Sequence, residues 1–84
     1  MTDDLLHDHP DDPPLYAEIC IHYIHQIHSG TIKHGQLLPP AWRIGEQFGV
    51  SRETARRGLK LLSTLGWAKP IPGYPYMALM PERN

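Results

Sequence analysis

The sequence has a single cysteine, Cys20, and no apolar run of the roughly 20 residues that a membrane-spanning helix needs. One cysteine excludes a disulfide bond within the chain, and we expect its thiol to lie buried on an apolar helix face of a reduced protein. No charged and then apolar leader of the kind found in signal peptides stands at the start. These absences predict a cytoplasmic protein.

The sequence also lacks the residue constellations that catalysis needs. No serine, cysteine or carboxylate stands with a base at a plausible spacing, and 84 residues are few for an enclosed substrate pocket. We therefore expect neither an enzyme nor a cofactor. The histidines at 22, 25 and 28 recur every three residues on one side of a predicted helix, which permits adjacent pairs to share a metal ion. A solvated polar face explains the same spacing, so no metal site is predicted.

Positive charge is missing from the first 14 residues. They hold five aspartates and neither Lys nor Arg, a net charge of -5, whereas the rest of the chain carries eight Lys and Arg against four Glu, a net charge of +4. The net charge of -1 for the whole chain therefore conceals a basic folded part, and local positive potential is what a nucleic-acid binder needs. We predict an acidic mobile tail at residues 1–13, a folded domain at residues 14–80 and a frayed end at residues 81–84.

The sequence does contain a basic segment with helical periodicity, at residues 41–65. A helix over residues 52–65 gathers small and apolar side chains on one side, namely Ala55, Gly58, Leu59, Leu61, Leu62 and Leu65. The other side is polar and basic, with Arg52, Glu53, Arg56, Arg57, Lys60, Ser63 and Thr64. Ser51 is a suitable N-cap residue, and Gly66 suits the left-handed end of the helix. The pattern predicts one buried face and one exposed basic face.

A shorter helix is expected just before this one. The two prolines at residues 39–40 are compatible with a helix over residues 41–48, because proline is tolerated in the first turn, where its missing amide is not needed. Ile44 and Phe48 would then be buried. Gly49 is expected to adopt a positive φ angle in the turn to the next helix. Two helices joined in this way predict a helix-turn-helix.

Segments on either side complete a small domain. Residues 15–29 carry a stripe typical of a packing helix, made of Leu15, Tyr16, Ile19, Cys20, Tyr23, Ile24 and Ile27. Residues 31–38 are too short for a helix and predict a loop or a brief strand. Near the end, two apolar segments flank a proline-containing turn, which predicts a two-stranded wing over residues 69–77. The expected fold is mainly α with a small β-wing: a winged helix-turn-helix of three helices and a short antiparallel hairpin.

Spaced residues along most of the chain form a further pattern. They are PLY at residues 14–16, SG at 29–30, Gly35, LP at 38–39, GVSR at 49–52, Leu59, Leu61, Leu62, GW at 66–67 and Gly73. With these residues the chain resembles, from residue 14 to about residue 80, the winged helix-turn-helix domain of the GntR family of bacterial transcription regulators. The resemblance implies that residues 51–57 begin a recognition helix in the major groove and that the wing tip reaches the neighbouring minor groove or its phosphates.

Candidate DNA-binding side chains follow from the chemistry of this helix. Arg52 and Arg56 lie one turn apart and can offer paired donors to guanine or phosphate, whereas Glu53 can accept from a cytosine amino group. Other side chains are expected to bind backbone phosphates: Thr54, Arg57 and Lys60. The candidates on this helix and its N-cap are Ser51, Arg52, Glu53, Thr54, Arg56, Arg57 and Lys60.

Two short segments depart from the family's pattern. The usual Ser or Ala, Glu, Arg, Glu run after Leu-Pro reads Pro-Ala-Trp-Arg, so that Trp42 stands where the family's DNA-contacting arginine would be. Either Arg43 takes over that contact or Trp42 packs on the DNA backbone or on a partner. The wing has Gly-Tyr-Pro in place of Gly-Arg-Gly, so these three residues offer no arginine for minor-groove reading. Gly73 and Tyr74 are the candidate contacts there.

We predict a sequence-specific DNA-binding transcription regulator, expected to be a repressor, that acts as a homodimer on double-stranded DNA. Residues 52–65 would enter the major groove and residues 69–77 the flanking minor groove or backbone. The family's longer effector-binding domain does not follow the wing, which favours a stand-alone short regulator over an expressed fragment and leaves no effector assignable. One alternative is an excision or architectural factor of a mobile element, which bends DNA. Another is a winged protein-interaction module that binds its partner through Ile21, Trp42 or the wing.

Overall fold

The computed structural model describes residues 14–81; the predicted acidic tail and most of the predicted frayed end lie outside the described residues. Three helices come first, α2 (Leu15–His28), α3 (Ala41–Phe48) and α4 (Arg52–Thr64). They are followed by β1 (Ala68–Ile71) and β2 (Tyr74–Ala78), which pair antiparallel and form the wing. The predicted winged helix-turn-helix is confirmed. In the described part of the chain, no helix has the length and apolar character needed to cross a membrane.

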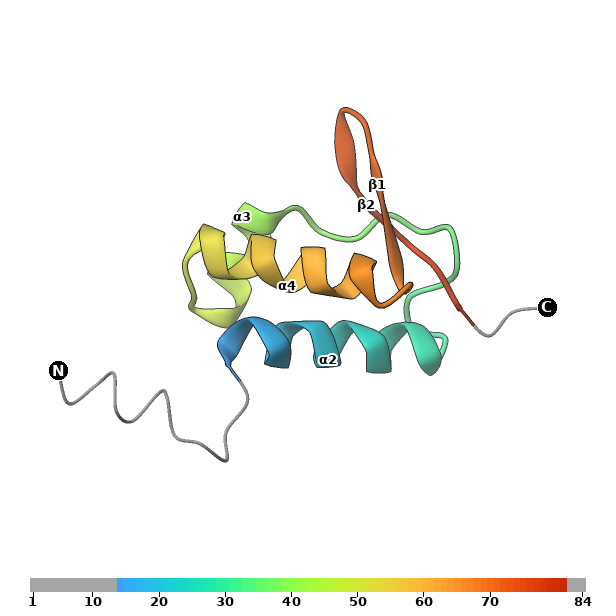
Figure 1. Ribbon diagram of the computed structural model, residues 1–84, viewed down its shortest axis with the longest axis horizontal. Helices are drawn as coiled ribbons and strands as arrows, with labels where there is room; N and C mark the ends of the chain where they lie inside the picture. Colours follow the sequence, from blue (N-terminus) through green and yellow to red (C-terminus); the bar gives the residue numbers. More distant parts are fainter. Residues whose placement is uncertain (1–13, 82–84) are drawn as a thin grey trace, which may run out of the picture.

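The two longer helices lie side by side, and both run in the same direction (Figure 1). Helix α3 packs beside the first half of α4, and the wing rises over the second half of α4 on the side that faces away from α2 (Figure 1). Helix α4 is therefore held by a neighbour on each of two sides. Its remaining face is open on the side toward which the wing projects.

The core is built from apolar side chains of every element and of the segment before α3. The fully buried members are Ile19, Cys20, Tyr23, Ile27, Leu38, Ile44, Ala55, Leu59, Leu62, Ala68 and Ala78. The predicted burial of Cys20 is confirmed, and burial raises the pKa of its thiol. A protonated, enclosed thiol is a poor nucleophile, so Cys20 acts as a small apolar core residue.

Two leucines that helical periodicity assigned to buried faces are exposed. Leu65 was expected on the core side of the recognition helix, but α4 ends at Thr64, and Leu65 is a C-cap residue with 52% of its surface exposed. Leu15 is the first residue of α2, lies at the edge of its apolar stripe and is 44% exposed. Phe48 was expected to be buried and is only partly buried. In each case the residue lies at a helix end, where the periodicity no longer determines burial.

The segment between α2 and α3 pairs with β2, as a brief third strand would. Gly35 donates its amide to Ala78 O at 2.7 Å, and Ala78 donates to Gln36 O at 2.8 Å. Further along, Leu38 donates to Tyr76 O at 2.8 Å. The segment predicted to be a loop or a brief strand thus ties the base of the wing to the helices.

The wing is irregular where proline interrupts it. Lys69 pairs with Met77, but Ile71 pairs with Tyr74, so the register shifts between the two pairs. Pro70 lies at this shift and has no amide hydrogen to donate to the neighbouring strand. The two strands are accordingly short, at four and five residues.

Gly58 lies where α4 packs tightly on α2. A Cβ atom at this position would lie 2.9 Å from Ile19 Cγ2, closer than such atoms pack, and 3.0 Å from the Tyr16 carbonyl oxygen, which is also tight. Alanine favours a helix interior over glycine by about 1 kcal/mol, but overpacking costs about 1–3 kcal/mol. We therefore expect Gly58→Ala to lower the free energy of unfolding in urea. If the variant has the same free energy of unfolding as the original chain, α2 and α4 can move apart to accommodate the added methyl group without loss of stability.

Candidate nucleic-acid interface

Two glycines set the turn that joins α3 to α4. Gly49 has a left-handed conformation with φ of 70°, as predicted, and lets the chain reverse direction after α3. Gly45 is buried in α3, and a Cβ atom there would lie 2.9 Å from the Val50 carbonyl oxygen. The small side chain therefore allows the turn to pack directly on α3. This close approach fixes the beginning of α4 relative to α3.

The first turn of α4 is capped by Ser51, as the sequence predicted. The Ser51 hydroxyl oxygen accepts from the Thr54 amide at 3.0 Å, and the hydroxyl donates to Thr54 Oγ1 at 2.9 Å. Arg52 is the first residue of the helix and is exposed. A helix N-terminus favours negative charge, so an exposed arginine there does not serve the stability of the helix. Such a departure from local preference is typical of a functional position.

Arg56 and Glu53, both predicted to read bases, contact each other. Arg56 Nε donates to Glu53 Oε1 at 3.2 Å, and Nη2 donates to Oε2 at 2.7 Å. The two side chains are 57% and 62% exposed. The hydrogen bonds and the negative charge of Glu53 raise the pKa of Arg56. Their spacing of three residues puts them on one side of α4, where each side chain is the other's partner.

Arg57 is turned toward α2, apart from the other two arginines of α4. Its guanidinium carbon lies 4.6 Å from the centre of the Tyr16 ring, within the range of a cation–π contact. Lys60, one turn after Arg56, is exposed. The predicted basic face of α4 is thus divided, with Arg57 on the side of the packing helix and Arg56 on the side of the wing.

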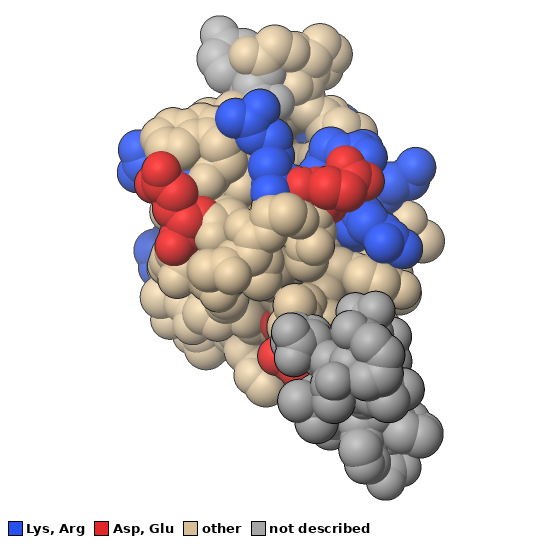
Figure 2. Space-filling model, turned by 90° about the vertical axis from the view of Figure 1, so that its left-hand side faces the viewer, with Lys and Arg blue, Asp and Glu red and all other residues tan. Residues whose placement is uncertain are grey.

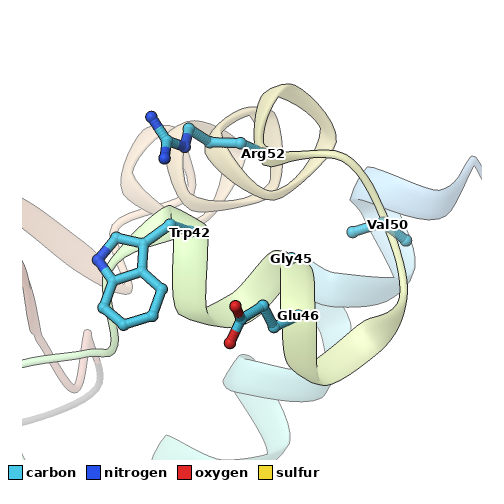
Figure 3. Close-up of a pocket in the computed structure, with 5 residues that line it drawn as sticks. All are labelled: Trp42, Gly45, Glu46, Val50 and Arg52. Atoms are coloured by element: carbon cyan, nitrogen blue, oxygen red, sulfur yellow. The ribbon is translucent and has the colours of Figure 1, made fainter.

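A hollow of about 370 Å³, which we call the Trp42 hollow, lies between α3 and the start of α4. It is lined by Trp42, Gly45, Glu46, Val50 and Arg52. Figure 3 shows the indole of Trp42 and the guanidinium of Arg52 projecting to the same side, with the carboxylate of Glu46 beside the indole. Arg43 lies over the indole, with its guanidinium carbon 5.3 Å from the ring centre. The structure therefore brings together the three candidates Trp42, Arg43 and Arg52.

A second hollow, of about 390 Å³, separates α4 from the wing, and we call it the wing hollow. Its walls are Pro40, Ala41, Arg56, Leu59, Gly73, Pro75 and Tyr76. Gly73 has a positive φ angle of 77° at the wing tip, and the backbone of Tyr74 begins β2. Arg56 and the predicted wing tip thus border one open space.

Basic side chains gather on the face formed by the start of α4. Figure 2 shows Lys and Arg in the upper part of this face, with acidic residues among them. Lys69, exposed on β1, adds a cation to the wing and was not among the predicted contacts. Its charge was visible in the sequence. Tyr76 and Glu46 were also missed, and their positions beside the hollows follow only from the wing register and from the packing of α3 on α4.

The histidines of α2 are partly used in packing. His22 meets Tyr23 and Phe48 edge-on, with ring centres 4.8 Å and 5.0 Å apart, and His28 lies 6.3 Å from Trp67 in the same way. His22 is half-buried, not on a fully solvated face as the periodicity suggested. Among residues 14–81, no group of three His, Cys, Asp or Glu side chains could hold a metal ion.

The chain is similar in sequence to known transcriptional regulators. The family model for bacterial regulatory proteins of the gntR family matches residues 15–75. The HTH-type transcriptional regulator YieP of Escherichia coli K12 is 37% identical over 59 residues, which are 70% of this chain and 25% of that protein. GgaR of the same strain, also an HTH-type transcriptional regulator, is 31% identical over 64 residues, 76% of this chain and 26% of its own. The chain spans about a quarter of the length of these relatives.

Solved structures have the same arrangement of helices and wing. AraR (DBD) in complex with operator ORR3 superposes with a TM-score of 0.75 at 28% identity, over 80% of this chain and 81% of that one. YtrA from Sulfolobus acidocaldarius, a GntR-family transcription factor, has a TM-score of 0.76 at 23% identity, over 92% of this chain and 66% of its own. The AraR structure is that of a DNA-binding domain in complex with its operator, whereas the similarity to YtrA shows the fold alone.

Proposed function

Because the chain belongs to the GntR family of bacterial regulatory proteins, we propose that it is a sequence-specific DNA-binding transcription regulator. Helix α4 enters the major groove, and the wing follows the flanking minor groove or its phosphates. The observation that carries this proposal is the position of Arg52 and Arg56. Both lie on the open side of a helix that is capped by Ser51 and flanked by the wing hollow.

Arg52 is the side chain best placed to read a base. In residues 14–81 no carboxylate pairs with it, and its guanidinium extends beside Trp42 at the open mouth of the Trp42 hollow (Figure 3). The free fork of an arginine matches guanine O6 and N7. Trp42, 47% exposed, packs on a deoxyribose at the edge of the groove, and Arg43 binds the adjoining phosphate. These roles account for tryptophan at a position where the family has arginine.

One domain offers only a few base-reading side chains, which is too little to select one site among the many in a genome. We therefore propose that two copies bind together, in the cytoplasm, to half-sites about one helical turn, roughly 34 Å, apart. A protein bound across a promoter in this way excludes other proteins from it, so the proposed effect is repression.

Selection from random double-stranded DNA at a fixed salt concentration tests the proposal. We expect enrichment of a sequence with two-fold symmetry and a complex whose mass corresponds to two chains on one duplex. Enrichment of several adjacent sites with bending of the DNA would favour an architectural factor instead. Failure to bind any DNA at low salt would contradict the proposed function and favour a protein-interaction module.

A further inference from the structure

The contact between Glu53 and Arg56 uses only part of the guanidinium. An arginine has five N–H donors in one plane, and this contact takes one hydrogen of Nε and one of Nη2. Three hydrogens remain, and two of them, one on Nη1 and one on Nη2, point in parallel from the outer edge of the plane. That edge has the geometry that matches O6 and N7 of guanine. The pair thus leaves a complete base-reading edge available.

The two-point contact also limits how Arg56 can move. A single hydrogen bond allows the guanidinium to rotate about it, whereas two parallel bonds fix the orientation of the plane. Exposed ion pairs contribute little to the stability of a fold, so the effect of this pair lies in the orientation it gives Arg56. Arg56 also lines the wing hollow, together with Tyr76 of β2. The Nη1 and Nη2 edge of Arg56 is therefore oriented before DNA binds.

We propose that Glu53 is a positioning residue that sharpens base discrimination: it holds Arg56 with the Nη1 and Nη2 edge presented to a guanine, and its charge opposes contact with phosphates. The inference rests on the proposed function. An arginine that is already oriented loses less conformational freedom when it binds a base. A carboxylate beside it repels phosphates, which lowers affinity for DNA of any sequence. Glu53 therefore lowers the affinity for DNA of any sequence and raises the selectivity for one base.

The test compares the 84-residue chain with its Glu53→Gln variant on the selected site, on copies with each guanine replaced in turn, and on random DNA. Glutamine keeps the length of the side chain and one oxygen acceptor but loses the charge and the two-point contact. We expect discrimination at one guanine to fall roughly tenfold. Affinity for random DNA should rise roughly threefold, with a steeper dependence on salt.

Two further variants separate positioning from charge. Glu18→Gln changes the net charge equally on the first turn of α2 and should leave discrimination unchanged. In an Arg56→Ala background, Glu53→Gln should no longer alter discrimination at that guanine, because the two residues act as a unit. Circular dichroism of each variant establishes that the fold is intact, and Glu53→Ala repeats the measurement with a different side chain.

The outcomes distinguish this inference from the function it rests on. Selective binding by the original chain with unchanged discrimination in both Glu53 variants overturns the positioning role alone. A loss of discrimination that persists in the Arg56→Ala background also overturns it, because Glu53 would then read a base by itself. If the original chain selects no sequence at all, the proposed function fails, and the positioning role fails with it.

Discussion

Leu62→Ala is expected to lower the free energy of unfolding by about 2–5 kcal/mol. Leu62 is fully buried in the core beneath α4, so its truncation loses apolar burial and leaves a cavity. Small domains have a total stability of about 5–15 kcal/mol, and the loss is therefore a large share. Each kcal/mol corresponds to roughly 4–8 °C in Tm for a domain of this size. Urea unfolding followed by circular dichroism, together with a thermal melt, measures the change.

Leu65→Ala is the matched control, because the same residue type is truncated three positions along the chain. Leu65 is 52% exposed beyond the last residue of α4. Its replacement should change the free energy of unfolding by no more than about 0.5 kcal/mol. Equal losses in the two variants would contradict the structure, since they would mean that Leu65 is also in the core or that Leu62 is not.

The contrast between these leucines shows what periodicity can predict. Both residues lie on the same side of an ideal helix, so the pattern alone assigned both to the core. The signals that predicted the elements are local: the Ser51 cap, the positive φ of Gly49 and the prolines before α3. Burial at a helix end depends on where the chain turns, and Leu65 already belongs to the turn that leads to β1. The elements were therefore predictable, whereas burial at their ends was not.

The candidate site was predictable in its residue types but not in its internal contacts. Arginines at 52 and 56 on the polar side of α4 follow from the helical pattern. The Glu53–Arg56 pair lies within one helix, and its spacing was visible, but whether the two side chains meet each other depends on their rotamers. The contact of Arg57 with Tyr16 requires the packing of α2 on α4, which no local pattern contains. Local rotamers thus decide whether Arg56 is paired, and the packing of α2 on α4 decides the contact of Arg57.

Arg52→Ala is expected to weaken binding to the selected site by about 1–3 kcal/mol, or roughly 5- to 150-fold in Kd, with a much smaller effect on random DNA. The reason is that the Arg52 guanidinium has no carboxylate partner among residues 14–81 and stands exposed at the start of α4. Fluorescence anisotropy with both DNAs at one salt concentration gives the ratio. An equal loss on both would assign Arg52 to phosphate contact.

The fold should survive this substitution, which makes the affinity change interpretable. Removing a positive charge from a helix N-terminus relieves an unfavourable interaction with the helix dipole, so the free energy of unfolding should stay the same or rise slightly. Arg57→Ala is the control of equal charge, because its guanidinium lies over Tyr16 on the side of α2. It should weaken binding modestly and equally on both DNAs. Arg52→Lys should retain affinity for random DNA yet lose selectivity, since an ammonium group provides a point charge without the paired donors that a guanine requires.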